Sequence, residues 1–85
     1  MAEEKLIGKV THFFGKPGVG IVELSDILKV GDTIHIKGHT SDITQQVSSM
    51  QLEHEDISEG KSGDSVGIKI GQKVHEHDSV YKITD

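Results

Sequence analysis

The sequence predicts an all-β fold, a small six-stranded antiparallel β-barrel formed by residues 1–85 as a single domain. Two observations lead to this prediction. Short runs rich in Ile, Val and Thr are separated by turns that contain Gly, Asp or Pro. In addition, a turn-forming Asp followed by a hydroxyl residue and β-branched alternation recurs at residues 31–37, 63–69 and, more loosely, 77–83.

The first two strands are expected in the N-terminal third of the chain. Residues 1–5 are acidic and polar, and we expect a flexible terminus there. Residues 6–14 are rich in β-branched and aromatic types, which favours a strand, and the Gly-Lys-Pro-Gly sequence at 15–18 ends it. A second strand is expected over residues 19–24. The later strands are expected where apolar and polar residues alternate, at residues 33–37, 65–70 and 79–83.

Residues 42–53 fit either a helix or a strand. Ile43, Val47 and Met50 have the spacing of one helix face, but the residues between them are mostly Thr, Gln and Ser, several of which are poor helix formers. We therefore expect one long strand, with a bulge near Ser48 and Ser49 that restores the facing of Met50.

Composition limits the classes of function. The chain has no cysteine, so disulfides, thiolate zinc sites and thiol nucleophiles are excluded. Its formal net charge is −5 and all nine basic residues are lysines, which disfavours dedicated nucleic-acid binding because arginine supplies the bidentate fork for phosphates and base edges. The start of the chain has no signal-peptide pattern and no apolar run is long enough to cross a membrane, so we expect a cytoplasmic location.

One contact patch is predicted on the first strand and the loop that follows it. An exposed aromatic ring beside lysines can stack on a base or anchor a protein contact. Strict alternation places Val10 and Phe14 on one face and Phe13 on the other. The residues predicted to contact a protein or RNA partner are Lys9, His12, Phe13, Phe14 and Lys16.

Other polar clusters are interpreted as solvated surface. His75 and His77 are two residues apart and would need a third metal donor, for which Glu53, His54 and Glu55 are candidates, but we predict no metal and no other cofactor. The Gly60-Lys61-Ser62 sequence is not a nucleotide-binding loop, because residue 55 is glutamate where that loop needs glycine. No serine lies in a Gly-x-Ser-x-Gly sequence, and we predict no catalytic residues.

Several short segments occur in a fixed order along the chain: Gly20 to Leu24, Leu28 to Ile34, Val47 to Gln51, and Gly60 to Ile68. This ordered series resembles the second, β-barrel domain of elongation factor Tu and related translation GTPases. Similar barrels are appended to collagenase-like peptidases, and His12-Phe13-Phe14-Gly15-Lys16 is similar to that branch. The resemblance implies a closed or nearly closed barrel of the translation-factor second-domain type, with a history of docking on larger partners.

The sequence therefore predicts a stand-alone, non-catalytic binding or adaptor module, resembling a translation elongation factor domain, that docks on a larger protein or ribonucleoprotein. One alternative is weak RNA or tRNA binding through the predicted patch. A second alternative is an accessory domain of a collagenase-like peptidase. No nucleotide and no membrane partner is expected.

Overall fold

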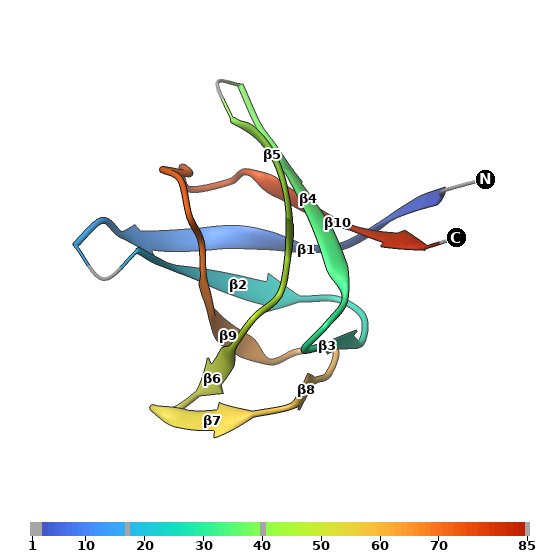
Figure 1. Ribbon diagram of the computed structural model, residues 1–85, viewed down its shortest axis with the longest axis vertical. Helices are drawn as coiled ribbons and strands as arrows, with labels where there is room; N and C mark the ends of the chain where they lie inside the picture. Colours follow the sequence, from blue (N-terminus) through green and yellow to red (C-terminus); the bar gives the residue numbers. More distant parts are fainter. Residues whose placement is uncertain (1–2, 17, 40, 85) are drawn as a thin grey trace.

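The computed structural model describes residues 3–16, 18–39 and 41–84, which form ten β-strands and no helix (Figure 1). The predicted all-β class is thereby confirmed. Since these ranges hold no helix, none of them forms a helical membrane span. The strands are β1 (Glu3–Phe14), β2 (Val19–Leu24), β3 (Leu28–Lys29), β4 (Thr33–Lys37), β5 (Asp42–Gln46), β6 (Met50–Leu52), β7 (Glu55–Ile57), β8 (Glu59–Gly60), β9 (Ser65–Lys69) and β10 (Ser79–Thr84).

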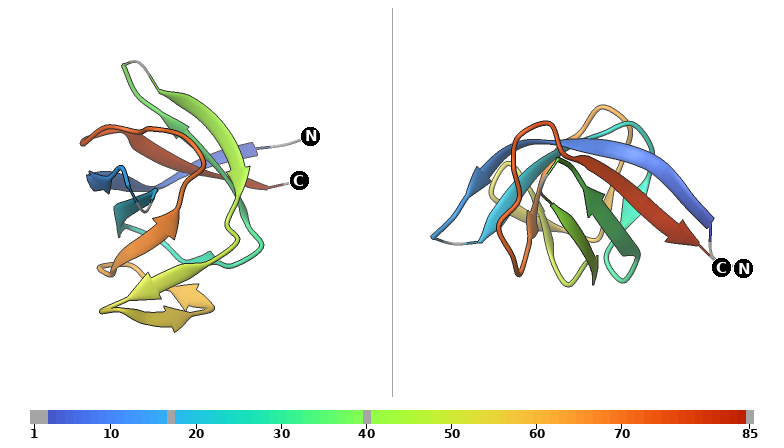
Figure 2. Two further views of the ribbon diagram at one scale, coloured as in Figure 1. Left: turned by 60° about the vertical axis from the view of Figure 1, so that its left-hand side comes forward. Right: turned by 90° about the horizontal axis from the view of Figure 1, so that it is seen from above.

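Eight strands form one antiparallel sheet that curves around the core (Figure 2). Their order is β5-β4-β10-β1-β2-β9-β6-β7, while β3 and β8 pair separately as a two-stranded ribbon. The expected N-terminal tail is in part a strand, because Glu3 to Lys5 begin β1 and lie opposite Thr84 to Lys82 of β10. Met1 and Ala2 lie outside the described residues.

The antiparallel all-β fold is as predicted, but the predicted number of six strands is wrong. The sheet has eight strands, and among the described residues its edge strands β5 and β7 do not pair with each other. Instead, β5 leads through Val47 to Ser49 into β6, so one segment pairs first with β4 and then with β9. The strand character expected for residues 42–53 is largely confirmed, but a break that changes partners replaces the expected bulge.

The side chain of Gln45 connects β5 to the end of β9, two strands that share no backbone ladder in the described part of the chain. The amide of Gln45 on β5 donates from Nε2 to the carbonyl of Lys69 at 2.8 Å, and its Oε1 accepts from the backbone N–H of Gly71 at 3.1 Å. The Gln45 side chain thus joins β5 to the end of β9.

The three predicted Asp turns share one geometry. In each, the Asp carboxylate accepts a hydrogen bond from the backbone N–H three residues earlier, and the Asp N–H donates to the carbonyl of that same residue. The residue before each Asp has a positive φ of 72° to 99°, as in a type II turn. The carboxylate bonds join Asp32 to Lys29 (2.9 Å), Asp64 to Lys61 (3.0 Å) and Asp78 to His75 (2.9 Å). We call these the Asp corners.

A bulge in β1 reverses the facing of the aromatic pair. The register of β1 against β2 shifts between Val10 and His12, so Thr11 is an extra residue. Beyond the bulge Phe13 packs against the buried core, whereas Phe14 is 47% exposed. The prediction that Val10 and Phe14 share one face is therefore wrong, because strict alternation does not hold across an extra residue.

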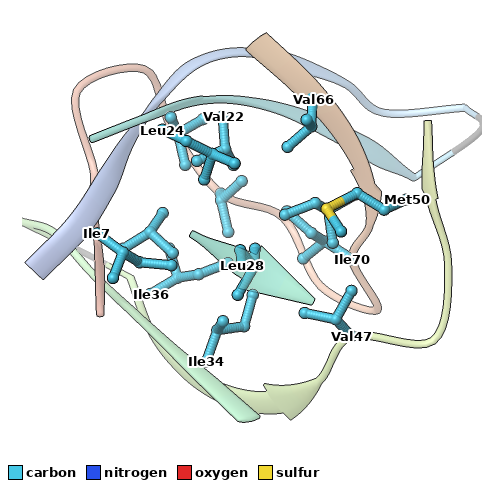
Figure 3. Packing of buried hydrophobic residues seen from close by; sticks show 14 of the residues in the cluster. Ile7, Val22, Leu24, Leu28, Ile34, Ile36, Val47, Met50, Val66 and Ile70 are labelled. Carbon is cyan, nitrogen blue, oxygen red and sulfur yellow. The ribbon is translucent and has the colours of Figure 1, made fainter. Parts of the chain in front are cut away.

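Aliphatic side chains from nearly every strand fill the interior. Figure 3 shows these side chains pointing toward one another inside the ring of strands, with Leu28 of the short β3 among them. Burial of this single cluster supplies the main stabilisation of the domain. Its members are Ile7, Val10, Val22, Leu24, Leu28, Ile34, Ile36, Ile43, Val47, Met50, Val66, Ile68, Ile70, Val74 and Val80.

The Asp corners give a test of backbone strain. Two of them have glycine at the positive-φ position, but the third has His77 at φ 72°. Replacing His77 with Gly relieves that strain and keeps the backbone N–H, so we expect the free energy of unfolding to rise by about 1 kcal/mol. Gly31→Ala, at φ 99° with open space around the added Cβ, is the opposite change and should lower it by about 1 kcal/mol. Urea unfolding followed by circular dichroism measures both, and a loss of stability in His77→Gly would contradict this account.

Candidate docking surface

Residues of four strands line a shallow groove of about 400 Å³ on the outer face of the sheet. Phe14 comes from β1, the middle of the groove comes from β2 and β9, and β6 with the turn after it forms one rim. We call this the β2–β9 groove. Its lining residues are Phe14, Val19, Ile21, Gln51, Glu53, His54, Ser65 and Gly67.

The floor of the β2–β9 groove is apolar because β2 carries hydrophobic residues on both faces. Val22 and Leu24 point into the core, so Val19 and Ile21 lie on the outer face, where they are only partly buried. Gly67 of β9 lies directly opposite Ile21. A Cβ atom at Gly67 would lie 3.3 Å from Val19 Cγ1 and 3.6 Å from Ile21 Cδ1, so its absence keeps the floor open.

A strained hairpin turn forms the polar rim of the groove. Glu53 and His54 connect β6 to β7 with φ values of 52° and 66°, the pattern of a type I′ turn. Such turns favour Asn-Gly, and other residues with positive φ cost on the order of 1–3 kcal/mol each. Glu53 makes this end of the groove acidic, while Glu23, which pairs with Ser65, also pairs with Lys9 and lines a neighbouring pocket. The opposite end is basic, since Lys69 pairs with Val19.

Phe14 is held at the far end of the groove by a neighbouring ring. The ring centroids of His12 and Phe14 are 4.4 Å apart, with the planes tilted by 57°. His12 Nδ1 in turn lies 3.5 Å from Glu76 Oε1. The contact fixes a large apolar side chain at the surface, which is typical of binding sites.

The structure divides the patch that the sequence predicts. Phe14 lines the β2–β9 groove and His12 contacts it, but Phe13 packs against the core and lines a different pocket. Lys9 lies on a third, separate surface beside Leu6 and Ser25, and Lys16 is exposed in the turn after β1. The role of these five residues in partner contact stays a prediction.

Most of the groove was not identified from the sequence. Val19 and Ile21 carried a usable signal, because they fall on the face of the predicted strand that Val22 and Leu24 do not use. The sequence gives no such signal for Gly67, Gln51 and the Glu53–His54 turn. These residues lie close together only because β6 pairs with β9.

The histidine pair does not gather a third metal donor in the described parts of the chain, where no group of three His, Asp or Glu residues could hold a metal. His75 Nδ1 lies 3.2 Å from Ser41 Oγ. The donors suggested by the sequence, Glu53, His54 and Glu55, lie instead at the β6–β7 turn.

A second polar cluster joins three strands on the other half of the sheet. His35 on β4 lies between two carboxylates, with Nδ1 2.9 Å from Glu4 Oε1 and Nε2 2.5 Å from Asp42 Oδ1. Its side chain is only 14% exposed, and the Tyr81 ring lies 6.3 Å away. The hydrogen bond to Glu4 and then the one to Asp42 raise the pKa of His35 above its ordinary value of 6.5, because only the imidazolium can donate to both carboxylates.

The architecture defines the chain as a small all-β domain with an incompletely closed barrel, and solved structures share it. It superimposes with a TM-score of 0.86 on the C-terminal domain of a putative U32 peptidase of Geobacillus thermoleovorans, at 16% identity over 92% of this chain and 91% of that one. The selenomethionine variant of that domain gives a TM-score of 0.85 at 15% identity, over 89% of this chain and 96% of that one. This similarity is one of fold.

A closer sequence similarity is to an uncharacterized protease of Methanocaldococcus jannaschii. The two are 41% identical over 80 residues, which is 93% of this chain but 20% of the protease. The chain thus spans about a fifth of that relative. No protein-family model matches the chain. Together these similarities support the predicted resemblance to barrels appended to collagenase-like peptidases, while the resemblance to elongation factor Tu stays a prediction.

The His35 cluster predicts a pH-dependent contribution to stability. A raised pKa in the folded state means that the contribution is complete below the unfolded-state pKa of about 6.5 and is lost as pH rises through the folded-state value. We expect the stability difference between wild type and His35→Gln to be larger at pH 6 than at pH 8.5. Urea unfolding at both pH values measures it, and a difference that grows toward pH 8.5 would contradict the assignment.

The strained turn predicts that its sequence can be improved. The double variant Glu53→Asn/His54→Gly places the preferred type I′ residues at φ 52° and 66°, so we expect the free energy of unfolding to rise by about 1 kcal/mol or more. Glu55→Asn removes a neighbouring carboxylate without changing a positive-φ position and serves as the control. Thermal and urea unfolding distinguish them; equal stability of the double variant and wild type would show that the turn stores no strain.

Proposed function

We propose that the chain is a non-catalytic accessory domain of a collagenase-like peptidase, which docks on the catalytic part of that enzyme. The observation that carries the proposal is the 41% identity to one fifth of a protease. The match in fold to a domain that lies at the C-terminus of a peptidase supports it.

The surface of the domain suits contact more than chemistry. The β2–β9 groove has an apolar floor and an exposed aromatic ring at one end, features that favour docking of another surface. Glu53, His54 and Ser65 also line it, but within the described ranges no hydrogen bond joins them, whereas a nucleophile and its base need such contact. This distribution of groups and the relatives support the accessory role.

The proposal corresponds to the second alternative that the sequence left open. The translation-factor adaptor and the weak RNA-binding module stay predictions without further support. The excess of acidic groups and the lack of arginine disfavour an RNA partner, because phosphate contacts depend on positive side chains.

The proposal predicts a salt-tolerant complex with a peptidase. We expect the purified chain to bind the catalytic part of a collagenase-like peptidase from the same source, with an affinity that changes less than about tenfold between roughly 50 and 200 mM salt. Isothermal titration calorimetry measures this, and affinity capture with and without nuclease is the control. Binding to RNA through several phosphates would lose orders of magnitude over that range. Capture that is abolished by nuclease, or no binding to the peptidase, would contradict the proposal.

A further inference from the structure

We infer that the β2–β9 groove binds an extended segment of a partner protein in which an apolar side chain and an Arg or Lys are separated by one residue, so that both face the groove. The identity of the partner as a peptidase rests on the proposed function, but the chemistry of the segment follows from the groove itself.

The floor selects the apolar side chain. Val19 and Ile21 are half-buried on the outer face, and Gly67 between them leaves room that a Cβ would narrow to 3.3 Å from Val19. Phe14, 47% exposed, closes one end as an aromatic wall. An aliphatic side chain seated here would remove apolar surface of Val19, Ile21 and Phe14 from water, which favours binding.

The acidic end selects the basic side chain. Glu53 lines this end of the groove, whereas Glu23, which pairs with Ser65, also pairs with Lys9 and lines a neighbouring pocket with it. The whole chain carries a net charge of −5, so its long-range field also attracts a cationic segment. Lys69 pairs with Val19 at the opposite end, outside the lining, and this charge difference between the two ends places the basic residue of the segment at the Glu53 end.

The backbone of the rim gives a separate argument for the carboxylate. Glu53 occupies a positive-φ position where Asn would be less strained, and His54 follows it in the same conformation where Gly is preferred. A carboxylate held at that position costs stability, and such strain concentrates at binding surfaces. The Glu53 carboxylate and the net charge of −5 would repel a phosphate backbone, so the groove fits a protein segment and not RNA.

The first experiment uses defined peptides. Three fluorescein-labelled ten-residue Gly-Ser peptides carry at their centre Ile-Ser-Arg, Ile-Ser-Glu or Ser-Ser-Arg, and they are named the Ile-Arg, Ile-Glu and Ser-Arg peptides. Fluorescence anisotropy measures their binding. We expect the Ile-Arg peptide to bind at least tenfold more tightly than the other two. No saturable binding of the Ile-Arg peptide, equal binding of all three, or its displacement by oligouridine would overturn the inference.

Variants then locate the site. Gly67→Val fills the floor and should weaken binding of the Ile-Arg peptide at least tenfold. The smaller change Gly67→Ala should weaken it less. Gly71→Val is the matched control, because a Cβ at Gly71 meets open space outside the groove. Glu53→Asn should remove the preference for Ile-Arg over Ile-Glu while the protein becomes no less stable, and Glu3→Asn is its charge-matched control. Unchanged binding in Gly67→Val, checked for folding by circular dichroism, would overturn the inference.

The catalytic part of the peptidase separates the two proposals. If it binds wild type and Gly67→Val equally, docking stands but the β2–β9 groove is not the docking site. If it binds neither while the Ile-Arg peptide binds wild type and not Gly67→Val, the groove inference stands and the peptidase assignment fails.

Discussion

The Asp corners fix where three strands begin, and the rest of the fold depends on them. Each carboxylate bonds the backbone N–H three residues earlier, so β4, β9 and β10 each start at a set position just after Asp32, Asp64 or Asp78. Two of the corners also follow the short strands β3 and β8, which pair with each other and place Leu28 in the core. Because a slip of one residue would turn every side chain to the other face, these turns decide which residues are buried.

Departures from regular alternation create the groove. The extra residue Thr11 turns Phe14 outward while Phe13 packs inward, and without it the groove would lose its aromatic wall. The break at Val47 to Ser49 has a similar effect, because it frees β6 from β4 and places Gln51 opposite Gly67. The local irregularities are therefore the source of the groove.

The sequence predicts the strands and corners well because these depend on neighbouring residues. The repeated Asp, with Gly31, Gly63 or His77 before it, is a local signal, and the alternation around Ile34 and Ile36 shows a buried face directly. The bulge, the incomplete closure and the groove are not local. Gly67 reads as an ordinary strand residue until β9 is placed beside Ile21, and nothing near His35 in sequence shows that Glu4 reaches it across β10.

The stability of the domain and its surface chemistry are set in different places. The core is one aliphatic cluster, and the corners, the Gln45 bridge and the His35 cluster hold the curved sheet around it. None of these groups lines the groove, which lies on the outer face of the sheet. There β2 exposes Val19 and Ile21, and the β6–β7 turn holds two residues at positive φ. A domain that needed only to fold would gain from a polar residue at Ile21 and from Asn-Gly in place of Glu53-His54. Ile21 and the Glu53–His54 turn both line the β2–β9 groove. Two features that lower stability thus lie on one surface, which is the physical reason for proposing the partner contact there.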